Sequence, residues 1–377
     1  MFFGQMCILF RTGGIGKDNY LMSNLERLKN RIAAEELDAV LLLDSYNRHF
    51  ATGFHSSSGA VIVTADDAWF ITDSRYIEAA QEAAAGRYNV CLHNGDHPMN
   101  SMIKSILAEQ GVSRLGGEAC RLSYEEYTAY EELLGIKMIG CQGMIDELRA
   151  VKNEEELAFM RKAQEITDDV FAYILTFIKP GMTERRVAAE LVYQMMLRGA
   201  DQVSFDPIVV AGHRSSMPHG VPSDNVIQEG DFVTMDFGCL YKGYCSDMTR
   251  TIAVGYATEE MRKVYDTVLQ AQLAGLAVSK AGVLGKDVDK AARDVIEAAG
   301  YGEYFGHGYG HCLGLEIHES PNANPRGDVP MPAGCVCSAE PGIYLPGKFG
   351  VRIEDTAIFR EDGVEILTKS PKDLIIV

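Results

Sequence analysis

The sequence predicts two domains, an α/β domain at the amino terminus and an α+β domain at the carboxy terminus. Its 377 residues are enough for two hydrophobic cores. Helix and strand patterns alternate through residues 23–148, whereas strand-like segments with glycine-rich turns dominate the second half. A boundary near residue 150 therefore gives expected domains at 23–150 and 151–377. Residues 1–22 are expected to be a disordered extension.

The amino-terminal domain is predicted to begin with a helix that Ser23 caps. Glu26 stands three residues later and completes a capping box. A loop containing Gly53 should follow the first strand, and a helix rich in alanine and glutamate should begin at Asp73 or Ser74. The predicted strands, of which the second and third form a hairpin, are 38–44, 60–64, 68–72, 88–93 and 114–118.

The carboxy-terminal domain is predicted to open on two helices. Asn153 and Glu156 form a second capping box for a helix over 154–177, and Thr183 starts another that runs to about Arg198. Strand-like segments then follow, interrupted by a helical pair at about 258–280 and 286–299. These segments read FDPIVVAG, DFVTMDFG, YCSDMTRTIAV, CVCSAEPGIY and VRIEDTAIF.

Composition excludes several classes of partner. The formal net charge of −18 argues against nucleic acid, whose phosphates need basic patches. No apolar run approaches the length of a membrane span, and the apolar start has no basic residue ahead of it and no small-residue cleavage site after it. The nine cysteines include no CxxC pair, which is typical of reduced thiols. A cytoplasmic protein is therefore expected.

Five residues with oxygen or nitrogen ligand atoms stand out in the second half. Together they supply enough ligands for two divalent cations, which could hold a hydroxide between them and polarise a scissile carbonyl. The set therefore predicts a dinuclear metallohydrolase. Its hard ligands favour Mn(II), although Co(II), Zn(II) or Fe(II) could fit. The neighbouring cysteines are soft ligands and are not expected to bind the metal. The five are Asp236, Asp247, His311, Glu340 and Glu354.

Two candidate hairpins would bring four of these ligands together. A turn centred between residues 241 and 242 would place Asp236 opposite Asp247, and a turn centred on Gly347 would place Glu340 opposite Glu354. Asp236, Glu340 and Glu354 have apolar flanking residues, and a charge buried in such a segment needs a partner. We therefore expect cations between the facing pairs.

The segments around these residues resemble those of the pita-bread metallopeptidases, and most closely the Xaa-Pro peptidases, aminopeptidase P and prolidase. The matching segments are TMDFG, YCSDMTRT, HGYGHCLGLEIHE, SAEPGIY and GVRIEDT, in the family's order. The resemblance extends from about residue 23 to the carboxy terminus. It implies a creatinase-like amino-terminal domain, a pita-bread carboxy-terminal domain and a homodimer in which residues near His55 border the partner's pocket.

The resemblance also implies a role for each ligand. Asp236 would bind one metal ion, His311 and Glu340 would bind the other, and Asp247 and Glu354 would bridge both. Glu340 would in addition shuttle a proton from the bridging hydroxide.

The histidines and the pocket wall receive roles in the same way. His219 would meet the substrate near the scissile bond, His318 would stabilise the tetrahedral intermediate, and His307 would line the proline pocket. Phe205 and Tyr344 are candidates for the apolar wall of that pocket, and Arg352 is a candidate to hold Glu354 or a substrate carboxylate. Two departures from the family concern Cys312, which stands where glycine is usual, and Tyr309, which should narrow the pocket.

The function that these observations favour is hydrolysis of the Xaa-Pro bond at the amino terminus of peptides. Aminopeptidase P and Xaa-Pro dipeptidase activities both stay open at this point. The alternatives are a catalytically inactive pita-bread module that binds peptides and a metal-free creatinase-like amidinohydrolase. The complete set of five ligands argues against both alternatives.

Overall fold

The computed structural model describes residues 21–377. Residues 1–20 of the predicted extension lie outside the described residues. Two compact units meet at the Arg149–Ala150 bond. No helix in the described part of the chain is long and apolar enough to cross a membrane. The eight cysteines of the described range form no disulfide.

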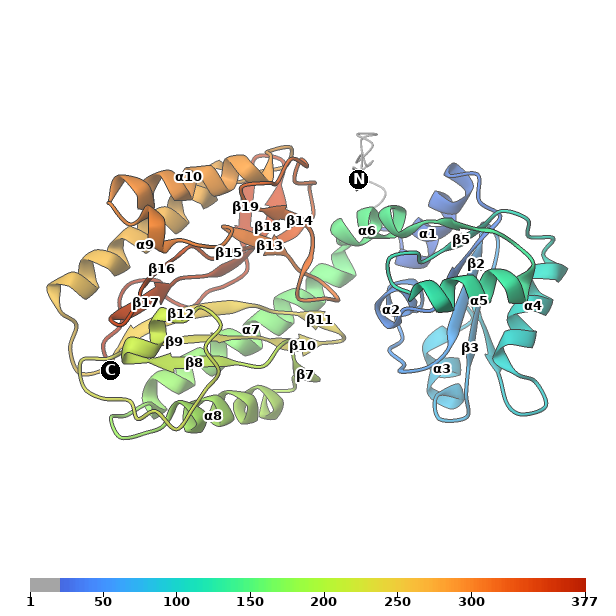
Figure 1. Cartoon of the computed structure of the whole chain (residues 1–377). Coiled ribbons are helices and arrows are strands. Elements are labelled where there is room, and N and C mark those ends of the chain that lie inside the picture. Colours follow the sequence, from blue (N-terminus) through green and yellow to red (C-terminus); the bar gives the residue numbers. More distant parts are fainter. Residues whose placement is uncertain (1–20) are drawn as a thin grey trace. The chain divides into compact units, whose positions relative to one another are not determined.

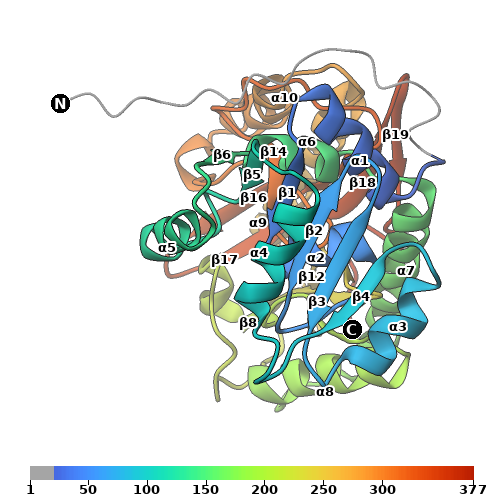
Figure 2. The same ribbon diagram turned by 90° about the vertical axis from the view of Figure 1, so that its right-hand side faces the viewer.

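The first unit is built on one sheet with the strand order β4-β3-β2-β1-β5-β6. Strands β1, β2 and β3 are antiparallel neighbours and lie side by side in Figure 2. The outer strands add in parallel, β4 to β3, β5 to β1 and β6 to β5. The strands are β1 (Ala39–Leu42), β2 (Ala60–Thr64), β3 (Ala68–Thr72), β4 (Asn89–Leu92), β5 (Leu115–Gly117) and β6 (Met138–Gly140).

Helices cover both faces of this sheet, because alternate strand residues point to opposite sides. Val40 and Leu42 belong to a core with α1, α3 and α6, while Ala39 and Leu41 pack with α4 and α5. The capping box of Ser23 and Glu26 is confirmed at the start of α1. The helices are α1 (Asn24–Ala34), α2 (Ser45–Thr52), α3 (Ile77–Ala84), α4 (Met99–Glu109), α5 (Tyr124–Leu134) and α6 (Gln142–Ala150).

Helix α2 corrects the loop expected after the first strand. Asp44 caps it by accepting hydrogen bonds from the Tyr46 and Asn47 backbone N–H groups, and Gly53 ends it with a φ of 70°. Its buried residues include Asn47, Arg48 and His49, so it lacks the apolar stripe by which a helix is recognised.

The second unit layers its strands between two pairs of helices, α7 and α8 on one side and α9 and α10 on the other (Figure 1). One core joins α7 and α8 to β8, β9 and β12, and the other joins α9 and α10 to the strands that follow them. The predicted capping box of Asn153 and Glu156 and the helix bounds 154–177 are confirmed. The helices are α7 (Glu154–Phe177), α8 (Glu184–Leu197), α9 (Glu259–Val278) and α10 (Gly285–Ala298).

The strands of this unit form two three-stranded sheets, a five-stranded sheet with the order β14-β13-β15-β18-β19, and the hairpin β16-β17. The first group contains β7 (Gln202–Val203), β8 (Ile208–Ala211), β9 (Phe232–Phe237), β10 (Cys239–Tyr241), β11 (Tyr244–Cys245) and β12 (Met248–Ala253). The second contains β13 (Gly310–Cys312), β14 (Glu319–Ala323), β15 (Val336–Ala339), β16 (Gly342–Leu345), β17 (Phe349–Arg352), β18 (Asp355–Arg360) and β19 (Gly363–Ile366).

Candidate metal centre

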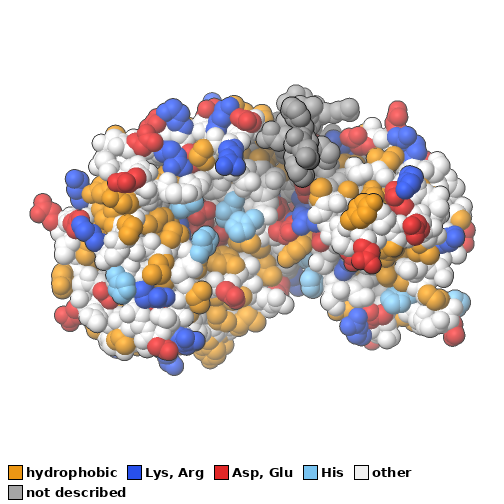
Figure 3. Space-filling model, in the orientation of Figure 1, with side chains coloured by type: hydrophobic (Ala, Val, Ile, Leu, Met, Phe, Trp, Pro, Cys, Tyr) orange, Lys and Arg blue, Asp and Glu red, His pale blue; other side chains and the backbone are white. Residues whose placement is uncertain are grey.

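The five predicted ligands line a single cavity of about 560 Å³ in the second unit. Asp236 lies on β9, His311 lies on β13, and Asp247 immediately precedes β12. Glu340 follows β15, and Glu354 lies between β17 and β18. In Figure 3, histidine side chains gather over a hollowed part of this unit's surface, with carboxylates visible between them.

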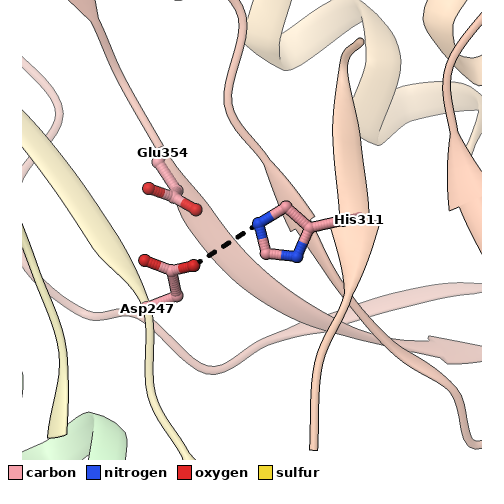
Figure 4. A group of neighbouring side chains, drawn as sticks. All are labelled: Asp247, His311 and Glu354. Carbon is pink, nitrogen blue, oxygen red and sulfur yellow. Dashed lines mark ion pairs between the residues drawn. The ribbon is translucent and has the colours of Figure 1, made fainter. Parts of the chain in front are cut away.

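Asp247, His311 and Glu354 form the tightest group (Figure 4). Each offers one ligand atom, and these atoms all lie within 4.8 Å of one another. His311 Nε2 lies 3.6 Å from Asp247 Oδ2 and 3.3 Å from Glu340 Oε1. Its Nδ1 lies 3.2 Å from the Cys312 carbonyl, which can only accept, so Nδ1 carries the proton. Nε2 is thus free to bind a metal ion.

Three of the carboxylates leave one buried oxygen without a hydrogen-bond donor among the described residues. These atoms are Asp236 Oδ1, Asp247 Oδ1 and Glu354 Oε1. For two of them the other oxygen is occupied: Arg352 Nη2 donates to Asp236 Oδ2 at 2.6 Å, and Thr249 Oγ1 donates to Glu354 Oε2 at 2.7 Å. A buried carboxylate oxygen without a partner is costly, and a cation satisfies it. The donor set therefore fits divalent metal ions.

The acidity of these groups supports the same conclusion. Burial raises the pKa of Asp247 well above its usual range, and repulsion by Glu354 raises it further. Burial likewise raises the pKa of Glu354, with repulsion by Glu340 as the next cause. Four carboxylates around one cavity repel one another unless positive charge lies among them. Divalent cations would offset both causes.

One of the two predicted hairpin pairings is wrong, and the other is confirmed. Thr249, rather than Asp247, pairs with Asp236, because the turn between β10 and β11 falls at Lys242 and Gly243 with φ values of 52° and 81°. A two-residue turn with both φ values positive matches the twist of a hairpin, and it moves the expected centre of the turn along by one residue. Asp247 is therefore a diagonal neighbour of Asp236 on the same face.

The register of Glu340 and Glu354 agrees with the prediction. Ala339 pairs with Asp355 and Gly342 pairs with Arg352, and these two pairs flank the glutamates on either side. The same register therefore places Glu340 opposite Glu354.

The substrate side of the cavity is organised by a chain of hydrogen bonds. Arg352 Nη1 donates to the Tyr344 hydroxyl at 2.9 Å, and this hydroxyl lies 2.9 Å from His307 Nε2. His307 Nδ1 lies 2.8 Å from the Gly308 carbonyl, so Nδ1 holds the proton and Nε2 accepts from the tyrosine. Burial lowers the pKa of His307, which keeps the imidazole neutral.

The remaining predicted residues, Phe205, His219 and His318, also line the cavity. The His318 ring stands edge-on against His311, with centroids 4.4 Å apart. Partial burial lowers the pKa of His318, and His311 lowers it further. The structure thus brings every predicted site residue to one place.

Two expectations about side chains are corrected. Arg352 forms no hydrogen bond or ion pair with Glu354: it is 3% exposed and donates to Asp236 and to the Thr249 hydroxyl. Tyr309 does not narrow the pocket. Its ring lies in the space left by Gly275, where an added Cβ would come within 2.3 Å of it. It is 1% exposed, because the side-chain-free glycine admits the ring into the core.

Some residues that organise the site escaped the sequence analysis. Ser338 accepts from the His311 backbone N–H at 3.0 Å and donates to Glu340 Oε1 at 3.0 Å. Thr249 connects Arg352 to Glu354. Only their positions could have identified them in the sequence. Ser338 lies two residues before Glu340 and Thr249 lies two residues after Asp247, so in an extended chain each shares a face with a ligand.

The sequence and the structure both match known proteins. Residues 158–361 match metallopeptidase family M24, and residues 24–151 match the creatinase/prolidase amino-terminal domain. An uncharacterised peptidase of Bacillus subtilis is 42% identical over 94% of this chain and 99% of its own length. These matches confirm the predicted creatinase-like and pita-bread folds.

Two solved structures are similar over nearly their whole length. The Xaa-Pro dipeptidase from Bacillus anthracis has a TM-score of 0.89 and 43% identity, covering 94% of this chain and 99% of that one. The X-Pro aminopeptidase from Thermotoga maritima has a TM-score of 0.88 and 36% identity, covering 92% of this chain and 100% of that one.

Proposed function

We propose that this chain, which belongs to metallopeptidase family M24, is a dinuclear metal-dependent peptidase that hydrolyses the Xaa-Pro bond at the amino terminus of peptides. The observation that carries the proposal is the set of three unpaired, buried carboxylate oxygens, on Asp236, Asp247 and Glu354, in the cavity that His311 also lines. An inactive peptide-binding module would have no need to keep these atoms together in one cavity.

The ligands divide between two cations in this proposal. Asp236 would hold one ion, His311 and Glu340 would hold the other, and Asp247 and Glu354 would contribute to both. Bound there, divalent cations would lower the pKa of water and polarise the scissile carbonyl. Mn(II) suits the carboxylate-rich set best, with Co(II), Zn(II) and Fe(II) as alternatives.

The other side chains handle protons and substrate. The Glu340 side chain is 18% exposed and can reach the substrate. It accepts a proton from the attacking water and returns this proton to the departing proline nitrogen. His219 and His318 donate hydrogen bonds to the developing oxyanion. Phe205 and Tyr344 offer the apolar contact that a proline ring requires, because its nitrogen has no N–H to recognise.

Charge at the cavity wall favours peptides longer than two residues. Arg352 is the one lysine or arginine among the described residues that line the cavity, and Asp236, Thr249 and Tyr344 already occupy its guanidinium. A dipeptide would bring its terminal carboxylate to a wall without a free cation. A longer peptide presents an amide there, which Asn322 or Asn324 can bind.

Matched peptides test this assignment. We expect kcat/KM for Ala-Pro-Ala to exceed that for Ala-Ala-Ala and for Ala-Pro by about tenfold or more. Chelation should abolish turnover and Mn(II) should restore it, with elemental analysis giving two ions per chain. Full activity of the metal-free protein would contradict the proposal. No turnover of any Xaa-Pro peptide at full metal occupancy would favour the inactive alternative.

We further propose a homodimer in the cytoplasm, in which residues near His55 limit the length of peptide that enters the partner's cavity. Light scattering at low micromolar concentration tests the assembly. Deletion of residues 55–58 should relax the length limit without loss of metal. A fully active monomer would contradict this part of the proposal.

A further inference from the structure

Glu184 is a buried carboxylate that neither lines the cavity nor contacts a predicted ligand. It lies at the start of α8 and is 0% exposed. Oε1 accepts from the Ala211 backbone N–H at 2.8 Å and from Asn225 Nδ2 at 3.0 Å. Oε2 accepts from the Ser223 N–H and hydroxyl at 3.0 and 2.7 Å, and Arg214 Nε lies 3.1 Å from both oxygens.

These donors come from both ends of one loop. Ala211 is the last residue of β8, and Ser223 and Asn225 close the loop again at α8, where their carbonyls accept from the backbone N–H groups of Arg185 and Glu184. Between the two ends, residues 218–222 line the cavity and include His219. Glu184 therefore fastens the base of the loop that presents this histidine.

Two further contacts hold the loop. Arg214 Nη2 donates to the Val221 carbonyl at 2.8 Å, so the cation that Glu184 binds reaches the residues on the cavity wall. Gly350 on β17 donates its N–H to Ser215 Oγ at 2.9 Å, and a Cβ added to Gly350 would come within 2.2 Å of the Ser215 carbonyl. The loop thus has little room to settle in another position.

We propose that Glu184 is a positioning residue that fixes His219 at the scissile bond. The inference rests on the proposed peptidase function. Glu184 must be a carboxylate because donors converge on both of its oxygens. A glutamine would turn its NH₂ group toward donors in either orientation and leave one side of the loop base unsatisfied.

The test compares Glu184→Gln with Glu190→Gln, a change on the same helix whose carboxylate accepts from Tyr173 and Gln194. We expect Glu184→Gln to lower kcat for Ala-Pro-Ala by about ten- to a hundredfold, with a smaller change in KM and with wild-type metal content. Glu190→Gln should stay within about twofold of the wild type. A kcat for Glu184→Gln within about twofold of the wild type would overturn the inference.

A double-mutant cycle with His219→Ala separates positioning from general loss of structure. If Glu184 acts through His219, Glu184→Gln should have almost no further effect once His219 is alanine. Multiplicative losses would overturn the inference. Should Glu184→Gln fold poorly, Ser223→Ala removes one donor, keeps the carboxylate with Arg214, and should give the same non-additivity with a smaller loss. Absence of Xaa-Pro cleavage by the wild type would instead refute the proposed function.

Discussion

Both units bury carboxylates, but among the described residues only the second unit has buried carboxylate oxygens without hydrogen-bond donors. In the first unit Glu118 is 0% exposed, yet Oε2 accepts from the Leu43 and Asp44 N–H groups at 2.5 and 2.9 Å, and Oε1 accepts from Asn47 at 2.6 Å. Asp247 and Glu354 are also buried, at 4% and 1% exposed, and each has one unpaired oxygen. Burial of an acid therefore does not indicate a metal site, whereas an unpaired oxygen does.

The difference comes from the backbone around each group. Glu118 faces the segment between β1 and α2, where N–H groups outside a strand ladder are available to a carboxylate. Asp236 and Glu354 lie on or beside strands whose N–H groups are used by neighbouring strands and backbone carbonyls. An acid placed there must find its partner outside the backbone, and a cation meets that need.

The largest effect is expected from removing charge at the unpaired oxygens. Asp247→Asn preserves size but eliminates the charge that the cations would share. It should lower kcat/KM by several orders of magnitude and reduce metal content while the fold survives. Glu118→Gln is the matched change in the first unit and should leave metal content unchanged. Activity and elemental analysis of both variants would decide, and near-native turnover of Asp247→Asn would contradict the ligand assignment.

Metal binding should also affect hydrogen exchange in the two units differently. Mn(II) at 100 times its dissociation constant stabilises the state that binds it by about 2.7 kcal/mol. Hydrogen exchange should therefore slow in β9, β12 and β13 when Mn(II) is added to the chelated protein, and should stay unchanged in β1 and β5. Equal protection of both units would contradict a metal site confined to the second unit.

Loss of the satisfied carboxylate should be a problem of stability alone. Glu118→Ala removes the acceptor of the buried Asn47 side chain and of the partly buried Leu43 and Asp44 N–H groups, which costs about 1–3 kcal/mol. Opening free energies from hydrogen exchange in β1 and β5 should fall by that amount. Glu125→Ala, an exposed change on α5, is the control. A change in metal content of the Glu118→Ala variant would contradict the separation of roles.

The smallest effect concerns pH. Burial raises the pKa of Glu118 above its ordinary value of 4.5. Because the folded-state pKa is the higher one, the contribution of this group is complete below pH 4.5 and is lost as the pH rises through the folded-state value. In the Glu118→Gln variant, the free energy of opening of the first unit, measured by hydrogen exchange, should therefore depend less on pH above 4.5 than in the wild type. An unchanged slope would show that Glu118 does not titrate there.

Local patterns predicted much of the fold because their causes lie within a few residues. The capping box at Asn153 and Glu156 and the hairpin around Gly347 needed no tertiary information. Helix α2 was missed because burial of polar residues hides its period. The hydrogen bond between Arg352 and Thr249 joins residues 103 apart in the sequence. Glu184 and Ser223, which bond between a helix and a loop, are 39 residues apart. Which atoms meet across strands cannot be read from spacing along the chain.

The turn at Lys242 and Gly243 contributes no ligand, yet its length decides where two of them point. Because side chains alternate along a strand, one residue added to or removed from the turn would shift the pairing of β9 with β12 and send Asp236 or Asp247 to the opposite face. Surface loops usually tolerate changes in length. Most substitutions at Lys242 should therefore be tolerated, whereas an insertion or deletion in this turn should not. The length of the turn, rather than its amino-acid composition, fixes the spacing of the metal ligands.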